Sequence, residues 1–64
     1  MKPDQDYINR LEPGDKIQST NGETTTIMER DKWGDIKAVT DGGYSRFFDK
    51  NGEGNPCSGS IKTP

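Results

Sequence analysis

The clearest strand in the chain is the stretch ETTTIMER, residues 23 to 30. Threonine and isoleucine are β-branched, and such residues favour the pleated, half-buried backbone of a sheet. Successive side chains of a strand point to opposite faces, so Thr25 and Ile27 share one face while Thr26 and Met28 share the other. The stretch therefore predicts a central strand, and the rest of the fold can be read outward from it.

Toward the N-terminus, Asn21-Gly22 is a strong hairpin signal and predicts a strand over residues 16–19 on its other side. Pro13-Gly14-Asp15 reads as a turn. Before that turn, Asp4 is a suitable N-cap for a short helical turn. One face of this helical turn carries the apolar side chains at helical spacing, Tyr7, Ile8 and Leu11.

Toward the C-terminus, residues 31–35 form a connecting loop that carries Trp33, the one tryptophan. Residues 35–40 alternate again, with Ile36 and Ala38 on one face and Lys37 and Val39 on the other. Turn signals at residues 41–43 and 49–52 enclose a further strand over residues 44–48. Residues 60–62 are the candidate for a last strand, and we expect no internal repeat.

These elements predict an all-β fold, a small SH3-like barrel of four to five short antiparallel strands with a short N-terminal helical turn. A chain of 64 residues forms one domain, with the helical turn in residues 1–12 and the barrel core in residues 13–53. Residues 54–64 form a tail or the final short strand. Closure into a barrel removes exposed strand edges, which a chain with only 25% hydrophobic residues could hardly cover.

The order of the turn and strand segments resembles small SH3-like β-barrel proteins that bacteriophages and prophages encode. The segments that carry the resemblance are a "GD-x-hydrophobic" entry strand, a Gly-led second strand, a "DG" hairpin, and an aromatic strand ending at "D-x-N-G". In this chain they are Pro13-Gly14-Asp15-Lys16-Ile17, Gly22-Glu23-Thr24-Thr25-Thr26-Ile27, Asp41-Gly42-Gly43-Tyr44-Ser45-Arg46-Phe47 and Asp49-Lys50-Asn51-Gly52. The resemblance implies the fold and a viral origin, and it brings no catalytic residues with it.

Composition argues against several functional classes. Nine Lys and Arg against eleven Asp and Glu give a net charge of −2, which does not favour non-specific nucleic-acid binding. No apolar run exceeds two residues, so no membrane span is expected. The chain has no histidine, which removes histidine acid–base chemistry, histidine metal sites and Ser-His triads. We expect a protein that is not an enzyme and has no catalytic residues.

The single cysteine, Cys57, excludes an intrachain disulfide and is consistent with a reducing cytoplasm. It lies in a Pro/Gly/Ser-rich segment without a neighbouring base, so an activated nucleophile is not expected. Asp49-Lys50-Asn51-Gly52-Glu53-Gly54 resembles the start of an EF-hand loop, but Ser60 stands where the bidentate glutamate belongs. A hairpin turn explains the same residues, and we predict neither a metal nor a cofactor.

The aromatic strand at residues 44–48 has apolar side chains on both faces. Tyr44, Arg46 and Phe48 share one face, and Phe47 shares the core with Ile27 and Ile36, unless the parity is reversed. One small core cannot take all of these rings. Exposed aromatic residues beside arginine are typical of protein interfaces.

We therefore expect a binding patch built from Trp33, Tyr44, Arg46 and Phe48, with Lys32 and Lys37 as basic neighbours. The expected function is that of a phage-encoded accessory protein in the host cytoplasm, which inhibits a host bacterial defence factor by covering its surface. Its partner is then a host bacterial protein, and a homo-oligomer is a further option.

The alternative is a nucleotide or nucleic-acid binding module, including an oligomeric sponge for a cyclic nucleotide. In that reading Arg46, Lys37 and the threonine hydroxyls hold phosphates while an aromatic ring stacks on the base. Aspartates at positions 31, 35, 41 and 49 are interleaved with the basic residues, and such mixed charge is typical of a solvated surface.

Overall fold

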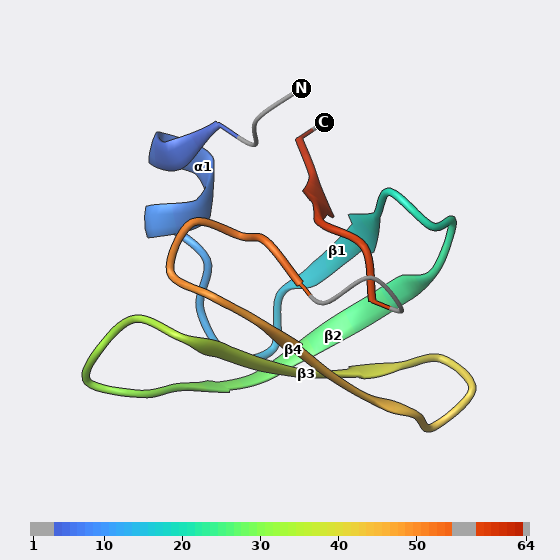
Figure 1. Cartoon of the computed structure of the whole chain (residues 1–64). Helices are drawn as coiled ribbons and strands as arrows, with labels where there is room; N and C mark the ends of the chain where they lie inside the picture. The colour runs from blue at the N-terminus through green and yellow to red at the C-terminus, as the bar shows by residue number, and fades with distance from the viewer. Residues whose placement is uncertain (1–3, 55–57, 64) are drawn as a thin grey trace.

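The computed structural model describes residues 4–54 and 58–63; the prediction for Cys57 lies outside these ranges. The elements are α1 (Gln5–Asn9), β1 (Lys16–Ser19), β2 (Thr24–Arg30), β3 (Ile36–Thr40), β4 (Ser45–Phe48) and β5 (Ile61–Lys62). The strands form one antiparallel sheet in the order β4-β3-β2-β1-β5, which curls into a half-barrel beside α1 (Figure 1). This confirms the predicted class, a small all-β fold consistent with an SH3-like barrel.

The N-terminal helix begins as the sequence predicts. The Asp4 carboxylate accepts hydrogen bonds from the amides of Asp6 (2.9 Å) and Tyr7 (3.4 Å), which have no carbonyl partner within the helix. Ile8 and Leu11 are buried in the core, and Tyr7 packs against it. The helical turn is therefore held by both its cap and its apolar face.

Four hairpin loops share one backbone geometry. In each loop the first residue donates its amide hydrogen to the carbonyl of the fifth, and a glycine in the fourth position donates back to the first. Each of these glycines has a φ between 81° and 90°, the arrangement of a type I turn followed by a G1 bulge. The loops begin at Ser19, Asp31, Thr40 and Asp49, and their glycines are Gly22, Gly34, Gly43 and Gly52.

Two of these loops form a short local repeat that the sequence analysis missed. The loops DKWGD (residues 31–35) and DKNGE (residues 49–53) match in sequence as well as in backbone bonds. In both, one oxygen of the leading aspartate accepts from the amides two and four residues later, at 2.8–3.0 Å. The Asp49 carboxylate thus stabilises a hairpin turn, as the alternative to an EF-hand predicted.

A β-bulge in β2 changes which way the end of this strand faces. Ile27 pairs with Ala38 and Glu29 pairs with Lys37, so Met28 is an extra residue without a partner. The bulge lets Met28 and Glu29 both lie exposed outside the sheet. It also brings Arg30 opposite Ile36, a residue of the buried face.

The Arg30 guanidinium joins three segments of the chain. It donates to the carbonyls of Ile8 (2.8 Å) and Leu11 (3.1 Å) at the end of α1, and to that of Gly34 (3.1 Å) in the β2–β3 loop. Carbonyls at the end of a helix lack intrahelical partners, and a cation near them is favourable. Arg30 therefore attaches the helix to the sheet.

The chain after β4 turns back and pairs both with the end of β4 and with the residue before β5. Phe48 and Gly54 form a β-bridge, as do Glu53 and Ser60. The Gly54 amide donates to the Gly59 carbonyl at 2.8 Å. At Gly54 a Cβ atom would lie only 2.3 Å from that carbonyl oxygen, so the two segments approach too closely for any side chain.

One prediction about the core is wrong: Phe48, and not Phe47, fills it. The Thr40 amide donates to the Tyr44 carbonyl across the β3–β4 loop, and this pairing sets Phe48 opposite Ile36. Phe48 is 2% exposed, whereas Phe47 is 57% exposed. The hairpin therefore has the reversed parity, which the sequence left open: Phe48 faces the core and Phe47 faces outward.

The close approach at Gly54 can be tested against a glycine with open space. Gly54→Ala is expected to destabilise the fold by about 3 kcal/mol or more, because the added methyl overlaps backbone atoms. Gly14 has a φ of 97° and no atom near its Cβ position, so Gly14→Ala costs only backbone strain of about 1–2 kcal/mol. Urea unfolding measures both, and equal losses would contradict the close approach.

The role of Arg30 can be tested by Arg30→Met. We expect a loss of about 2 kcal/mol, because three carbonyls lose a charged donor. Amide hydrogen exchange should speed up most in and just after α1, at Ile8 and Leu11. Arg10→Met is the matched control, since Arg10 is exposed and its Nε, among the described residues, bonds only to the Asp6 carbonyl of the same helical segment. Uniform acceleration over the whole sheet would argue against a specific attachment of the helix.

Candidate functional site

The six residues predicted to bind do not form one patch. Lys32 and Trp33 lie in the β2–β3 loop, whereas Tyr44 lies in the β3–β4 loop at the opposite end of β3. Arg46 lies in β4, where it pairs with Ala38 in the middle of β3. The five residues of β3 separate these loops by about 16 Å at roughly 3.3 Å per residue. Figure 1 shows the two loops at opposite ends of the sheet.

At the β2–β3 loop, Trp33 is largely in solvent, with 68% of its surface exposed. The Lys32 ammonium lies 4.5 Å from the centre of its ring, within the range of a cation–π contact. The Asp31 carboxylate accepts from the Trp33 amide and so holds the loop backbone. Trp33 does not cap the barrel and is available to a partner.

At the β3–β4 end, Arg46 is held by Glu23 in a bidentate ion pair. Its Nε and Nη2 donate to the two carboxylate oxygens of Glu23, each at 2.9 Å. The hydrogen bond from Arg46, and after it one from Asn21, lowers the pKa of the Glu23 carboxyl below its ordinary value. The guanidinium carbon also lies 5.7 Å from the Tyr44 ring centre. Arg46 thus joins the β1–β2 turn to β4.

The two remaining predicted residues are separated by the sheet itself. Phe48 belongs to the core and is too buried to contact a partner. The prediction that it forms part of the binding patch is therefore wrong. Lys37 lies on the outer face of the sheet, where its ammonium is 3.0 Å from the Glu29 carboxylate. Both members of that pair are more than half exposed, so the pair contributes little to stability.

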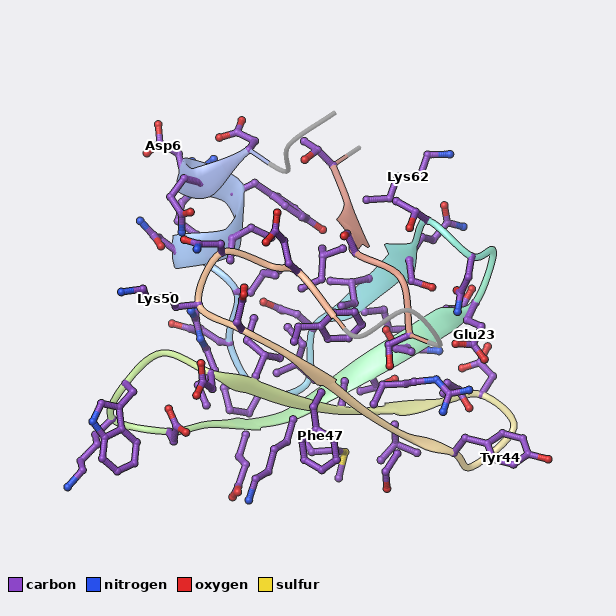
Figure 2. The ribbon with its side chains drawn as sticks, viewed as in Figure 1. Asp6, Glu23, Tyr44, Phe47, Lys50 and Lys62 are labelled. Carbon is purple, nitrogen blue, oxygen red and sulfur yellow. The ribbon has the colours of Figure 1, made fainter. Side chains whose placement is uncertain are left out.

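The outer face of the sheet carries an apolar surface that was not predicted from the sequence. Lys37 pairs with Glu29 on one side and with Phe47 on the other, so these side chains share a face with the bulged Met28. Met28 and Phe47 are each 57% exposed. Figure 2 shows Phe47 directed away from the sheet. We call these four residues the outer patch: Met28, Glu29, Lys37 and Phe47.

The alternation in residues 23–30 already placed Met28 opposite the core face, and that in residues 35–40 did the same for Lys37. Two of the four residues of the outer patch were therefore readable from the sequence. Phe47 was missed because its parity depends on the register of the β3–β4 hairpin. A one-residue shift in that register would exchange the faces of Phe47 and Phe48.

A hollow of about 360 Å³ adjoins the outer patch. Besides Phe47 and Lys37, its lining includes three aspartates from the two matching loops: Asp31, Asp35 and Asp49. Over the described parts of the chain, no group of three or more carboxylate, histidine or cysteine side chains is arranged to hold a metal ion. We call this feature the acidic hollow.

Within residues 4–54 and 58–63, the only helix is α1, and it is far too short to cross a membrane.

The Glu23–Arg46 pair predicts a pH dependence of stability. Because the pKa of Glu23 is lowered in the folded protein, its ion pair stabilises the fold fully above the ordinary glutamate pKa and is lost as the pH falls through the lowered value. Glu23→Gln should therefore be less stable than the parent at pH ~7, and the difference should shrink toward pH ~3. Urea unfolding across this range measures it.

Glu29→Gln is the matched control, since it removes a glutamate from an exposed ion pair. It should change the free energy of unfolding by less than about 1 kcal/mol at neutral pH. A Glu23→Gln difference that stayed constant down to low pH would show that the charge on Glu23 is not the cause.

Comparison with known proteins found no match: no family model, no curated protein and no solved structure matches the chain.

Proposed function

We propose that this chain is a non-enzymatic binding protein that docks onto a partner protein through the outer patch. The observation that supports it is the exposure of Met28 and Phe47 on an open sheet face, while the isoleucines of the other face are buried. Methionine and phenylalanine are enriched in protein interfaces. A small core leaves these side chains uncovered, and a partner would remove them from water.

The charges around the patch indicate the surface it would fit. The acidic hollow places three carboxylates beside Phe47. A complementary surface would offer an apolar side chain over Met28 and Phe47 and a basic side chain to the hollow. Trp33 and Lys32, in the loop that supplies Asp31, would extend the contact at its rim.

The resemblance to phage-encoded barrels suggests the biological setting. In this setting the protein would act in the cytoplasm of a bacterial host. It would inhibit a host defence factor by covering a surface that the factor needs. Such steric inhibition requires no catalytic group on the chain. Self-association through the same patch would use the same chemistry.

Binding of a nucleotide or nucleic acid has less support from the geometry. Arg46 and Lys37 were the residues expected to hold phosphates. Each already contacts a carboxylate, Arg46 that of Glu23 and Lys37 that of Glu29. A phosphate would have to displace these partners, so we favour the protein interface.

The test replaces both apolar residues of the patch, in the double variant Met28→Thr/Phe47→Thr. Threonine suits an exposed strand position, so folding should be kept. Tagged parent and variant are used to capture proteins from bacterial lysate, and the captured protein is then purified for titration. We expect the variant to bind it at least tenfold more weakly, because exposed apolar anchors carry much of an interface's energy.

Tyr44→Thr is the matched control, since Tyr44 is equally exposed but lies at the far end of β3. It should bind like the parent. Sedimentation of parent and double variant then separates the two kinds of partner: a parent oligomer that the variant loses would identify the patch as a self-association surface. Unchanged binding in the double variant, or loss of binding in Tyr44→Thr alone, would refute the proposed surface.

A further inference from the structure

The outer patch is symmetric along one row of the sheet in everything except the sign of its charges. Glu29, Lys37 and Phe47 lie side by side on β2, β3 and β4. Met28 precedes Glu29 on the outside of β2, so the patch is apolar, acidic, basic and apolar in turn. When such a row is turned round and laid on its own copy, each acid meets a base. A two-fold interface requires a surface that is complementary to itself in this way.

The two charges of the row are accessible to a second copy. The side chains of Glu29 and Lys37 are 60% and 55% exposed. Since their ion pair within one copy contributes little to stability, exchanging it for a pair between copies costs the fold little. Charges at an interface fix its register more than its affinity, and the apolar side chains at the two ends of the row supply the affinity.

The rest of this face would let a second sheet approach. Thr26 lies opposite Val39, and Val39 lies opposite Ser45, so the row next to the patch is small and uncharged. Packed sheets lie about 10 Å apart, with the side chains of both faces between them. Only Glu29 and Lys37 are charged among the outward-facing residues of these strands, which are Thr24, Thr26, Met28, Glu29, Lys37, Val39, Ser45 and Phe47.

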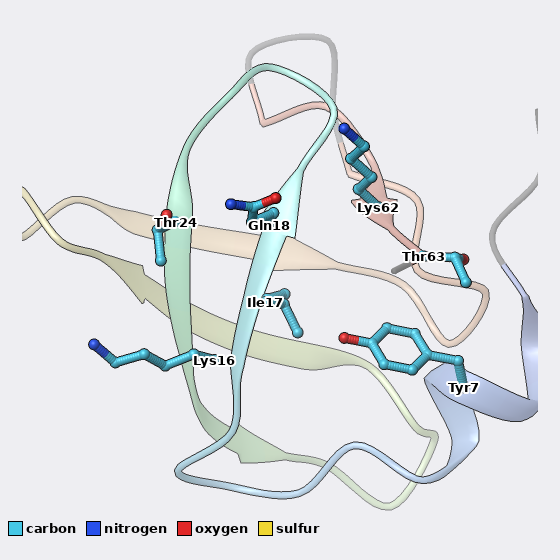
Figure 3. Close-up of a pocket in the computed structure, with 7 residues that line it drawn as sticks. All are labelled: Tyr7, Lys16, Ile17, Gln18, Thr24, Lys62 and Thr63. Carbon is cyan, nitrogen blue, oxygen red and sulfur yellow. The ribbon is translucent and has the colours of Figure 1, made fainter.

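A two-fold axis parallel to the strands, between β2 and β3, produces the required arrangement. These are the middle strands in the order β4-β3-β2-β1, so the axis lays β1 of each copy over β4 of the other. Figure 3 shows Lys16 on β1 pointing away from the buried Ile17 that follows it. Lys16 shares the outer face because it pairs with Thr26. The axis thus brings Lys16 over the strand that borders the acidic hollow of the other copy.

We propose that the outer patch binds a second copy of this chain in solution, with Glu29 of each copy paired with Lys37 of the other. Phe47 of each copy comes over the side of the sheet that carries Met28 of the other. This inference rests on the proposed function, since it names what occupies the same docking surface in the free protein. A partner protein that docks on the patch must displace the second copy, so its binding dissociates the dimer.

The dimer is weak because its contact is small. The sheet curls around the core, so its outer face is convex and two such faces meet only at their middle (Figure 1). The contact is therefore smaller than the roughly 800 Å² per partner of a standard interface. A weak dimer suits a surface that a partner protein has to occupy.

The test is a charge exchange, measured by sedimentation equilibrium of the full chain from about 10 μM to about 1 mM, the range of a small interface. We expect the parent to dimerise. Glu29→Lys alone and Lys37→Glu alone should each weaken the dimer at least tenfold, because like charges then meet across the axis. An equimolar mixture of the two variants should dimerise within about threefold of the parent. In the mixed dimer every lysine of the row meets a glutamate.

Lys62→Glu is the matched control, since it makes the same change of charge as Lys37→Glu at a place far from Phe47 (Figure 2). It should dimerise like the parent, and urea unfolding should show all the variants folded. A parent that stays monomeric at about 1 mM would overturn the proposal. So would a mixture that associates no more tightly than either variant alone.

The failure of this inference can be told from the failure of the proposed function. The capture experiment with Met28→Thr/Phe47→Thr tests whether a partner protein uses the outer patch, and the charge exchange tests only the second copy. A monomeric parent whose captured partner is lost by Met28→Thr/Phe47→Thr would refute the dimer and support the docking surface. A dimer restored in the mixture supports the second copy whatever the capture experiment finds.

Discussion

The hydrogen bonds from the Arg30 guanidinium to three backbone carbonyls hold the separate parts of this small fold together. They join the end of α1 and the β2–β3 loop to the sheet. Arg30 reaches these carbonyls only because the bulge at Met28 turns the end of β2 toward the buried face. The same extra residue puts Glu29 outside, next to Met28. One irregularity in one strand thus creates both the attachment of the helix and the place of Glu29 in the outer patch.

A chain with so few apolar residues depends on its turns as much as on its core. All four hairpin loops have the same backbone geometry, with three residues between the bonded first and fifth residues. In three of them the side chain of the first residue accepts a hydrogen bond from a backbone amide of the turn. Over the described residues, the large apolar side chains that stay exposed are Met28 and Phe47 on the outer face and Trp33 and Tyr44 in two of the loops.

The candidate site was predictable only in part. Trp33 and Tyr44 are exposed, as an interface role requires, and Lys37 lies on the outer face. Their grouping into one patch with Arg46 and Phe48 did not hold, because β3 separates the two loops and Glu23 engages Arg46. Charge pairing between residues 23 positions apart leaves no local pattern in a sequence.

By itself the sequence determined the all-β class, the place of each strand and turn, the Asp4 cap and the buried alternation of Thr25 with Ile27. Each of these follows from local chemistry: β-branched residues, glycine at positive φ, and side chains that accept backbone amides. Tertiary structure alone decided which of Phe47 and Phe48 enters the core, where Arg30 points and how the chain returns at Gly54. These depend on register and on a bulge, which are set by pairing between strands, and a shift of one residue exchanges the two faces of a strand at almost no change in local preference.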